Sequence, residues 1–214
     1  MIDSKIIKID KIKLPNVSRE TLEELVDYSR SILSTNKKIN LISSSTEKSI
    51  NIRHIYDSAQ TIEFIDKNDI KICTDLGSGA GLPSIVLGIL MKSKRQGFKL
   101  IFYEKSFHKS NFLKEMVKKF KLEAEINQKN IFEQKNLVTD VIICRAFKPL
   151  PVIFDIATKN FKNFKYIVMY LGKSRKKILK YVSTKWKFDL EEMKSLTNEE
   201  SSVVKISNLK KKYE

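Results

Sequence analysis

Cysteine and histidine are scarce in this chain of 214 residues, which contains two of each. Cys73 and Cys144 lie far apart in apolar runs, which excludes a disulfide framework and indicates two reduced thiols in a cytoplasmic protein. His54 and His108 are isolated, and no two cysteines have the spacing of metal ligands. We therefore expect no metal site.

Long hydrophobic runs are also missing. No stretch approaches the roughly 20 consecutive apolar residues that a transmembrane helix needs. The chain begins MIDSKIIKID, which alternates charged residues with isoleucine and lacks both the apolar segment of a secretory signal and a lipidation motif. The sequence thus predicts a protein without a membrane partner.

Acidic residues are few relative to basic ones, with 25 Asp and Glu against 41 Lys and Arg and a net charge of +16. Such an excess favours a polyanionic partner, which is usually nucleic acid and less often an anionic membrane surface. A genome rich in A and T would also raise the lysine count, but it would not gather the lysines into clusters.

The basic residues do gather in two parts of the chain. Residues 159–187 contain ten Lys or Arg and no Asp or Glu, with Phe, Tyr and Trp between them. Contacts of such clusters with phosphates supply affinity that falls steeply with salt. Any single lysine can instead belong to a solvated helix face, so the prediction of RNA contact concerns the clusters as a whole. The second cluster consists of Lys105, Lys109, Lys114, Lys118 and Lys119.

The order of apolar patterns predicts one α/β structural unit, because 214 residues with 42% hydrophobic side chains suffice for one substantial core. Residues 1–66 read as a helical extension packed on the sheet, and residues 67–214 as a Rossmann-like domain with a mostly parallel seven-stranded sheet and helices on both faces. A closing antiparallel hairpin is expected between Trp186 and Leu209. The other expected strands are 71–76, 98–104, 122–127, 139–144 and 164–171, and the expected helices are 18–35, 46–66, 84–93, 107–120, 149–160 and 173–183.

Glycine is rare, but three of the six glycines stand at alternate positions in the stretch TDLGSGAGLPS, at Gly77, Gly79 and Gly81. The stretch follows the first expected strand, where open parallel sheets bind ligands. A dinucleotide fingerprint would need glycine at the position of Leu82. The observed spacing, with Asp75 two positions before the first glycine, is instead the form expected of class I methyltransferases that bind S-adenosylmethionine. A glycine-rich turn also has purely structural uses.

Glu104 ends the next expected strand, KLIFYE, just over twenty residues after the glycines. A carboxylate there can accept hydrogen bonds from both hydroxyls of an adenosine ribose. Two alternatives stay open. Glu104 can be a solvated strand end or the cap of the following helix, and an NAD-type cofactor would also use such a carboxylate.

The end of the fourth main strand, VIICRAFKP, discriminates among methyltransferases. The tetrapeptide typical of amino-group methylation, an Asp, Asn or Ser followed by two prolines and an aromatic residue, is absent. Cys144 could be a nucleophile for C5 methylation, but a thiol at a buried strand end is usually a core residue. Arg145 is the better candidate near the acceptor, because a guanidinium there is costly unless it meets an anion or an aromatic face. His54 and Asp57, three residues apart, can lie on one helix face, either beside the site or as a packing contact.

The motifs taken together are similar to the ribosomal RNA small subunit methyltransferase G family, also called glucose-inhibited division protein B. The resemblance implies transfer of a methyl group from S-adenosylmethionine to the N7 atom of one guanine in 16S rRNA, as naked RNA or in the small ribosomal subunit, by an enzyme expected to be a monomer. It also implies that Gly77, Leu82, Asn130, Ile131 and Arg145 contact the cofactor, with Asp75 and Glu104 at the acidic strand ends. The matching blocks, in order and spacing, are NKKINLISS, RHIYDS, TDLGSGAGLPS, YEKSFHKSNFLKEM and DVIICRAFKPL.

The chain departs from the family pattern at Thr35, where a tryptophan is usual, at Leu171, where lysine commonly precedes Gly172, and at Ser84, which is often glycine. Lys173 follows Gly172 and could replace the missing lysine. Guanine N7 has an in-plane lone pair and no proton to lose, so its methylation needs alignment and no general base. Other functions remain open: methylation of another RNA, of a small molecule or of a protein, and non-catalytic RNA binding on the same scaffold.

Overall fold

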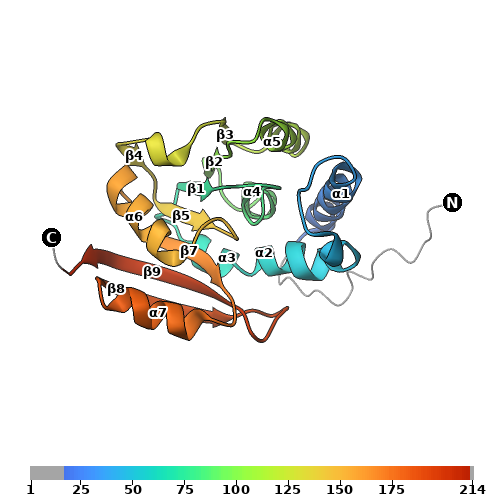
Figure 1. Cartoon of the computed structure of the whole chain (residues 1–214). Coiled ribbons are helices and arrows are strands. Elements are labelled where there is room, and N and C mark those ends of the chain that lie inside the picture. Colours follow the sequence, from blue (N-terminus) through green and yellow to red (C-terminus); the bar gives the residue numbers. More distant parts are fainter. Residues whose placement is uncertain (1–16, 213–214) are drawn as a thin grey trace.

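The computed structural model describes residues 17–212, and the expectation for the first ten residues lies outside them. These residues form a mainly helical segment, followed from β1 onward by strands with helices between most of them (Figure 1). The helical segments are α1 (Arg19–Asn36), η2 (Ser44–Ser49), η3 (Asn51–Tyr56), α2 (Asp57–Ala59), α3 (Ile62–Ile65), α4 (Ser84–Lys92), α5 (Phe107–Lys119), η4 (Ile131–Glu133), α6 (Leu150–Asn160) and α7 (Arg175–Ser183). The strands are β1 (Ile72–Leu76), β2 (Lys99–Tyr103), β3 (Ala124–Asn127), β4 (Leu137–Val138), β5 (Val141–Cys144), β6 (Phe161–Asn163), β7 (Tyr166–Leu171), β8 (Trp186–Lys194) and β9 (Ser202–Lys211).

The main sheet has seven strands in the order β3-β2-β1-β5-β7-β9-β8. Strands β3, β2, β1, β5 and β7 pair in parallel, whereas β9 is antiparallel to both β7 and β8. Helices α1, α4 and α5 lie on one side of the sheet and α6 and α7 on the other (Figure 1). The predicted fold class and the closing hairpin are confirmed; the small parallel pair of β4 and β6 was not expected.

Alternation of side chains along the buried strands divides the core into two clusters. In β5, Val141 and Ile143 pack with the residues of α1, α4 and α5, while Ile142 and Cys144 pack with those of α6. Because successive side chains of a strand point to opposite faces, an uninterrupted apolar run such as VIIC requires cover on both faces. The continuous apolar runs that predicted a parallel sheet therefore also required the two helical layers.

The predicted helix over residues 46–66 is wrong as a single element. The chain forms a 3-10 turn, a π-helical turn and two short α-helical segments there instead. The Thr61 hydroxyl donates to the Ser58 carbonyl at 2.6 Å, and the Gln60 amide donates to the Asp57 carbonyl at 2.9 Å. Such side-chain bonds to nearby carbonyls compete with regular helical bonds, and Asp57 is buried by contacts with distant segments.

Within residues 17–212, no helix is long and apolar enough to cross a membrane. The same described residues contain no group of three His, Cys, Asp or Glu side chains placed to hold a metal ion.

Candidate functional site

The glycine turn, defined as residues 77–83, leaves β1 at the edge of the sheet where the parallel strands end. Gly77 and Gly79 have φ angles of +67° and +56°, a region that side chains with a β-carbon rarely adopt. A β-carbon at Gly77 would come within 2.0 Å of the Phe147 ring, whereas one at Gly79 would meet only the Gly77 carbonyl at 3.9 Å. Gly77 is therefore required by packing within the protein, and Gly79 faces open space on the side available to a ligand.

Helix α1 holds the glycine turn from behind. The fully buried Tyr28 donates its hydroxyl to the carbonyl of Ala80 at 2.6 Å, and its ring meets Phe120 edge to face. A β-carbon at Gly81 would lie 3.3 Å from this hydroxyl. The helical front segment thus fixes the conformation of a turn more than fifty residues away in sequence.

Glu104 joins the glycine turn to the end of β2. One carboxylate oxygen accepts the Gly79 N–H at 2.9 Å, and the other accepts the Ser106 N–H at 2.8 Å, at the start of α5. The carboxylate therefore caps a helix, as one alternative from the sequence holds, and also contacts the turn. Each oxygen keeps a lone pair for a further hydrogen bond, which is what a ribose hydroxyl would need.

Asp75 is fully buried at the end of β1, and neither carboxylate oxygen has a hydrogen-bond partner within the described residues. Burial, with the charge of the nearby Glu104, raises the pKa of Asp75 to about 7. The Ser84 hydroxyl is also buried without a hydrogen-bond partner in the described chain. A buried acid without partners is costly unless something pairs with it. The position thus suits a ligand that brings a hydrogen-bond donor or a positive charge to the turn.

The remaining residues predicted for the cofactor lie around the same edge. Asn130 is exposed and caps η4 by accepting the Phe132 N–H at 3.3 Å, and Ile131 is buried with its carbonyl held by Asn160 at 2.7 Å. Leu82 buries its side chain in the core cluster of α1 and α4, so only its main chain faces the turn.

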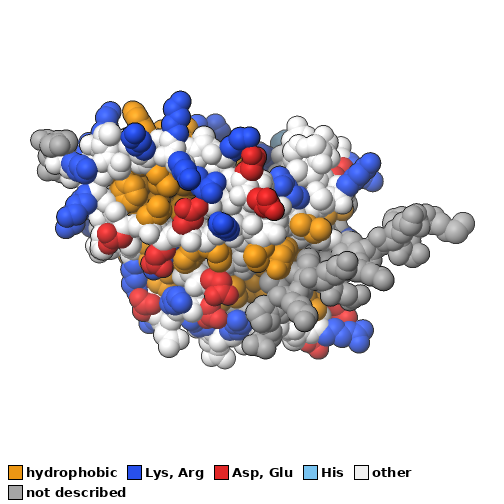
Figure 2. Space-filling model, turned by 90° about the horizontal axis from the view of Figure 1, so that it is seen from below, with side chains coloured by type: hydrophobic (Ala, Val, Ile, Leu, Met, Phe, Trp, Pro, Cys, Tyr) orange, Lys and Arg blue, Asp and Glu red, His pale blue; other side chains and the backbone are white. Residues whose placement is uncertain are grey.

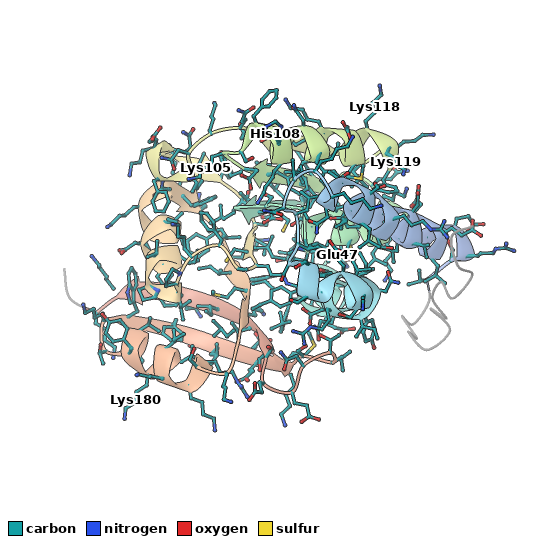
Figure 3. All side chains as sticks on the ribbon, turned by 45° about the vertical axis from the view of Figure 1, so that its right-hand side comes forward. Glu47, Lys105, His108, Lys118, Lys119 and Lys180 are labelled. Carbon is teal, nitrogen blue, oxygen red and sulfur yellow. The ribbon has the colours of Figure 1, made fainter. Side chains whose placement is uncertain are left out.

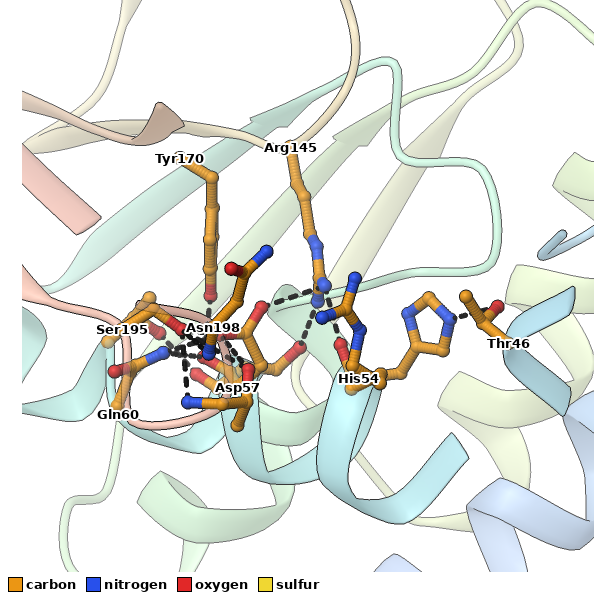
Figure 4. A network of polar contacts seen from close by, with 12 residues as sticks. Thr46, His54, Asp57, Gln60, Arg145, Tyr170, Ser195 and Asn198 are labelled. Atoms are coloured by element: carbon orange, nitrogen blue, oxygen red, sulfur yellow. Dashed lines mark hydrogen bonds and ion pairs between the residues drawn. The ribbon is translucent and has the colours of Figure 1, made fainter. Parts of the chain in front are cut away.

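Arg145, at the end of β5, meets both an anion and an aromatic face (Figure 4). Its guanidinium pairs with Asp57 at 2.8 Å and lies over the Tyr170 ring at 4.8 Å from the centroid. It also donates to the Arg53 carbonyl at 2.7 Å and to the Ser58 hydroxyl at 3.2 Å. These contacts satisfy the condition set by the sequence, but they direct the guanidinium toward α2.

Asp57 is the centre of this network, and its contacts with distant segments were not predicted from the sequence. Besides Arg145, its carboxylate accepts the Ser195 hydroxyl at 2.9 Å and the Thr197 hydroxyl at 3.0 Å, from the loop between β8 and β9 (Figure 4). His54 points away from this carboxylate and shares a hydrogen bond with Thr46 at 2.8 Å. Burial, with the adjacent Arg145 charge, lowers the pKa of His54 to about 4, so the imidazole is neutral near pH 7.

Cys144 lies in the core beside Arg145. Burial raises the pKa of its thiol, which keeps the sulfur protonated. A protonated, enclosed thiol is a poor nucleophile, in agreement with its interpretation as a core residue.

The β5 end, defined as residues 145–148, also contains an aromatic residue that the sequence argument passed over. Ala146 has a φ of +52°, unusual for a residue with a β-carbon, and the chain then places Phe147 over Gly77. The ring of Phe147 lies 6.4 Å from that of Phe132, which follows β3. The only sequence signal was an aromatic residue directly after Arg145 and Ala146.

The two basic clusters do not form one surface. Lys118 and Lys119 lie on α5 at one end of the molecule, and Lys180 lies on α7 at the other (Figure 3). On the face in Figure 2, basic side chains are spread among acidic and hydrophobic ones. Four of the ten basic residues in 159–187 pair with acids that lie outside this stretch: Lys159 with Asp155 on the same helix, Lys165 with Asp69 and Asp140, Lys173 with Glu200, and Arg175 with Glu192.

The model of the family "rRNA small subunit methyltransferase G" matches residues 21–205. The chain belongs to this family. The protein of that name from Pelagibacter ubique is 44% identical over 94% of this chain and 95% of its own length, and the one from Bartonella tribocorum is 33% identical over 92% of each.

The likeness to solved structures concerns the fold alone. A SAM-dependent methyltransferase from Aquifex aeolicus superposes with a TM-score of 0.57 at 14% identity, covering 81% of this chain and 96% of its own. The chain therefore has the class I methyltransferase fold. As a member of the rRNA small subunit methyltransferase G family, it is a methyltransferase whose cofactor is S-adenosylmethionine. The glycine turn and the two strand-end carboxylates are consistent with that family.

Proposed function

We propose that the protein methylates the N7 atom of one guanine in 16S rRNA, as a monomer in the cytoplasm, on naked RNA or on the small ribosomal subunit. The match to the family model over residues 21–205 carries this proposal. The intact donor side supports it, because a degenerate, non-catalytic scaffold would have no reason to keep a buried, unpartnered Asp75 beside the turn.

The residues around the glycine turn fit the cofactor. Asp75 would pair with its ammonium group, Glu104 would accept bonds from its ribose hydroxyls, and Asn130 with the main chain of Ile131 would face its base. Gly79 leaves the space that the ligand needs. When bound, the cofactor supplies a methyl group on a sulfonium centre, which an acceptor with a free lone pair can take directly.

The residues at the β5 end favour N7 as the acceptor atom. The Cys144 thiol is buried and protonated, and the Arg145 guanidinium is engaged by Asp57. Neither Cys144 nor Arg145 is therefore available as a nucleophile or as a general base. Guanine N7 needs neither, because its lone pair lies in the ring plane and carries no proton. What remains for the protein is to align acceptor, methyl carbon and sulfur.

We further propose that residues 1–66 and residues 67–214 work as one structural unit. The bond from Tyr28 to Ala80 and the ion pair between Asp57 and Arg145 both cross this boundary. Residues of the extension would then support both the glycine turn, through Tyr28, and the β5 end, through Asp57.

The test is methyl transfer to 16S RNA and to 30S particles that lack the modification, with digestion to nucleosides and mass spectrometry. We expect 7-methylguanosine at a single position that becomes sensitive to borohydride and aniline. Methyl groups on an exocyclic amine or on C5 of cytosine would overturn the N7 assignment. Methylation of neither RNA substrate would overturn the RNA proposal altogether.

A further inference from the structure

Three side chains form a cluster beside the glycine turn that the donor site does not use. Phe132 comes from η4 after β3, and Phe147 and Lys148 follow β5. The two rings have their centroids 6.4 Å apart and their planes inclined by 38°, and the Lys148 ammonium lies 5.9 Å from the Phe132 centroid. We call these residues the aromatic rim.

Phe132, the outer ring of the aromatic rim, is exposed and does not pack into the core. Phe132 has 46% of its surface accessible, although its neighbour Ile131 is buried in the core. Phe147 supports it from beneath, since this ring packs against Gly77 and joins the partly buried residues of the core. A Phe presented on a firm base is suited to contact a flat, apolar surface of a ligand.

Lys148 adds a charge that suits a polyanion. It is exposed and makes no ion pair with any carboxylate in residues 17–212, in contrast to the four paired basic residues in 159–187. Its position over a ring face leaves a cation and an aromatic surface side by side. Nucleic acids present this combination, because each nucleotide joins a flat base to a phosphate.

We propose that the aromatic rim holds one unstacked nucleobase of the RNA, with the base against Phe132 and Phe147 and a neighbouring phosphate at Lys148. The inference rests on the proposed function. It follows from the position of the rim, in which the Phe147 ring packs against Gly77 and Phe132 lies beside it, because a base stacked within a helix cannot reach a methyl donor at the turn and must leave its stack. The aromatic faces replace the stacking that the base loses.

The test compares Phe132→Ala with Phe132→Tyr in the full-length protein. Steady-state methylation of 30S particles or 16S RNA at saturating S-adenosylmethionine gives KM and kcat, and calorimetry gives the dissociation constant of the cofactor. Loss of stacking on one base lowers affinity by about 5-fold to 150-fold, so we expect Phe132→Ala to lower kcat/KM for RNA by about five-fold or more. Phe132→Tyr should stay near wild type, and cofactor affinity should be unchanged in both variants.

Phe107→Ala is the matched control, because Phe107 is 58% exposed at the start of α5 and packs only against His108 among the rings. It should leave kcat/KM near wild type. Lys148→Gln should weaken RNA binding and reduce the salt dependence by about one phosphate contact.

Three outcomes would overturn the inference. Phe132→Ala could leave kcat/KM for RNA unchanged, or Phe107→Ala could lower it as much. Weaker cofactor binding in Phe132→Ala, by the same factor as the loss in kcat/KM, would instead make the ring a wall of the cofactor's adenine site. Failure of the proposed function is separate, since it would show as absent RNA methylation by the wild-type protein.

Discussion

The glycine turn and the β5 end lie at the same edge of the sheet but are built differently. The turn relies on positive φ angles and on the Glu104 carboxylate, which follows the adjacent strand β2 and accepts the Gly79 N–H. The β5 end relies on side chains from distant segments, since Arg145 meets Asp57 and Tyr170. The conformation of the glycine turn is thus set largely by its own glycines, whereas the environment of Arg145 is set by segments far apart in the chain.

Gly79→Leu should have the largest effect and tests cofactor binding at the glycine turn. The substitution places a side chain in the open space of the turn and forces a φ of +56° on it, so we expect cofactor binding to be lost in calorimetry. Gly97→Leu is the matched control, because Gly97 also has a positive φ of +76° and an open surrounding but lies before β2. It should lose about 1 kcal/mol of stability and bind the cofactor normally. Normal binding by Gly79→Leu would mean that the cofactor lies elsewhere.

Asp57→Ala should have the next largest effect and tests how much the ion pair with Arg145 contributes to stability. It leaves the Arg145 guanidinium unpaired at a site where the two side chains are only 18% and 8% exposed, which should cost about 3–5 kcal/mol of unfolding free energy. Denaturant unfolding measures this loss. The double variant with Arg145→Met should recover part of it. Asp27→Ala removes an exposed pair with Lys119 and should cost less than about 1 kcal/mol; equal losses at both sites would contradict the buried network.

The pH dependence of stability tests Asp75. Burial raises its pKa to about 7 from the ordinary value of 3.8, so the folded protein holds a proton that the unfolded chain releases. Stability should therefore fall as pH rises from about 4 to about 7, by up to about 1.4 kcal/mol per pH unit, and the contribution should level off outside this window. Asp75→Asn should remove this slope in unfolding experiments between pH 4 and 8, and a slope that persists in the variant would assign it to other groups.

Tyr28→Phe should have the smallest effect and tests how the turn depends on α1. The variant loses the hydrogen bond to Ala80, worth about 1 kcal/mol, and we expect cofactor affinity to fall several-fold while kcat at saturation stays unchanged. Tyr166→Phe is the matched control, because the Tyr166 hydroxyl donates a similar hydrogen bond, to the Phe64 carbonyl at 2.5 Å, in another part of the fold. If both variants reduce cofactor affinity equally, the effect reflects general stability.

The same difference explains how much was predictable from sequence. Alternating apolar patterns and the spacing of Gly77, Gly79 and Gly81 are local signals, and they predicted the sheet, the turn and the Glu104 strand end. The network of Asp57 depends on a loop 138 residues later in the chain, at Ser195, which no local pattern encodes. The segment 159–187 shows the same limit, because acids such as Asp69 and Glu200, which pair with two of its lysines, come from other parts of the chain.

The hydrogen bond from Tyr28 to Ala80 couples the docking of α1 to the binding of the cofactor. If docked α1 improves cofactor affinity by holding the turn, then the bound cofactor must stabilise the docking of α1 by the same free energy. Amide hydrogens on the buried face of α1 should then exchange more slowly in the presence of S-adenosylmethionine, although the helix itself contributes no residue to the predicted cofactor contacts. Binding of the cofactor at the glycine turn would thus be measurable as slower amide hydrogen exchange in α1, which precedes the α/β region in the chain.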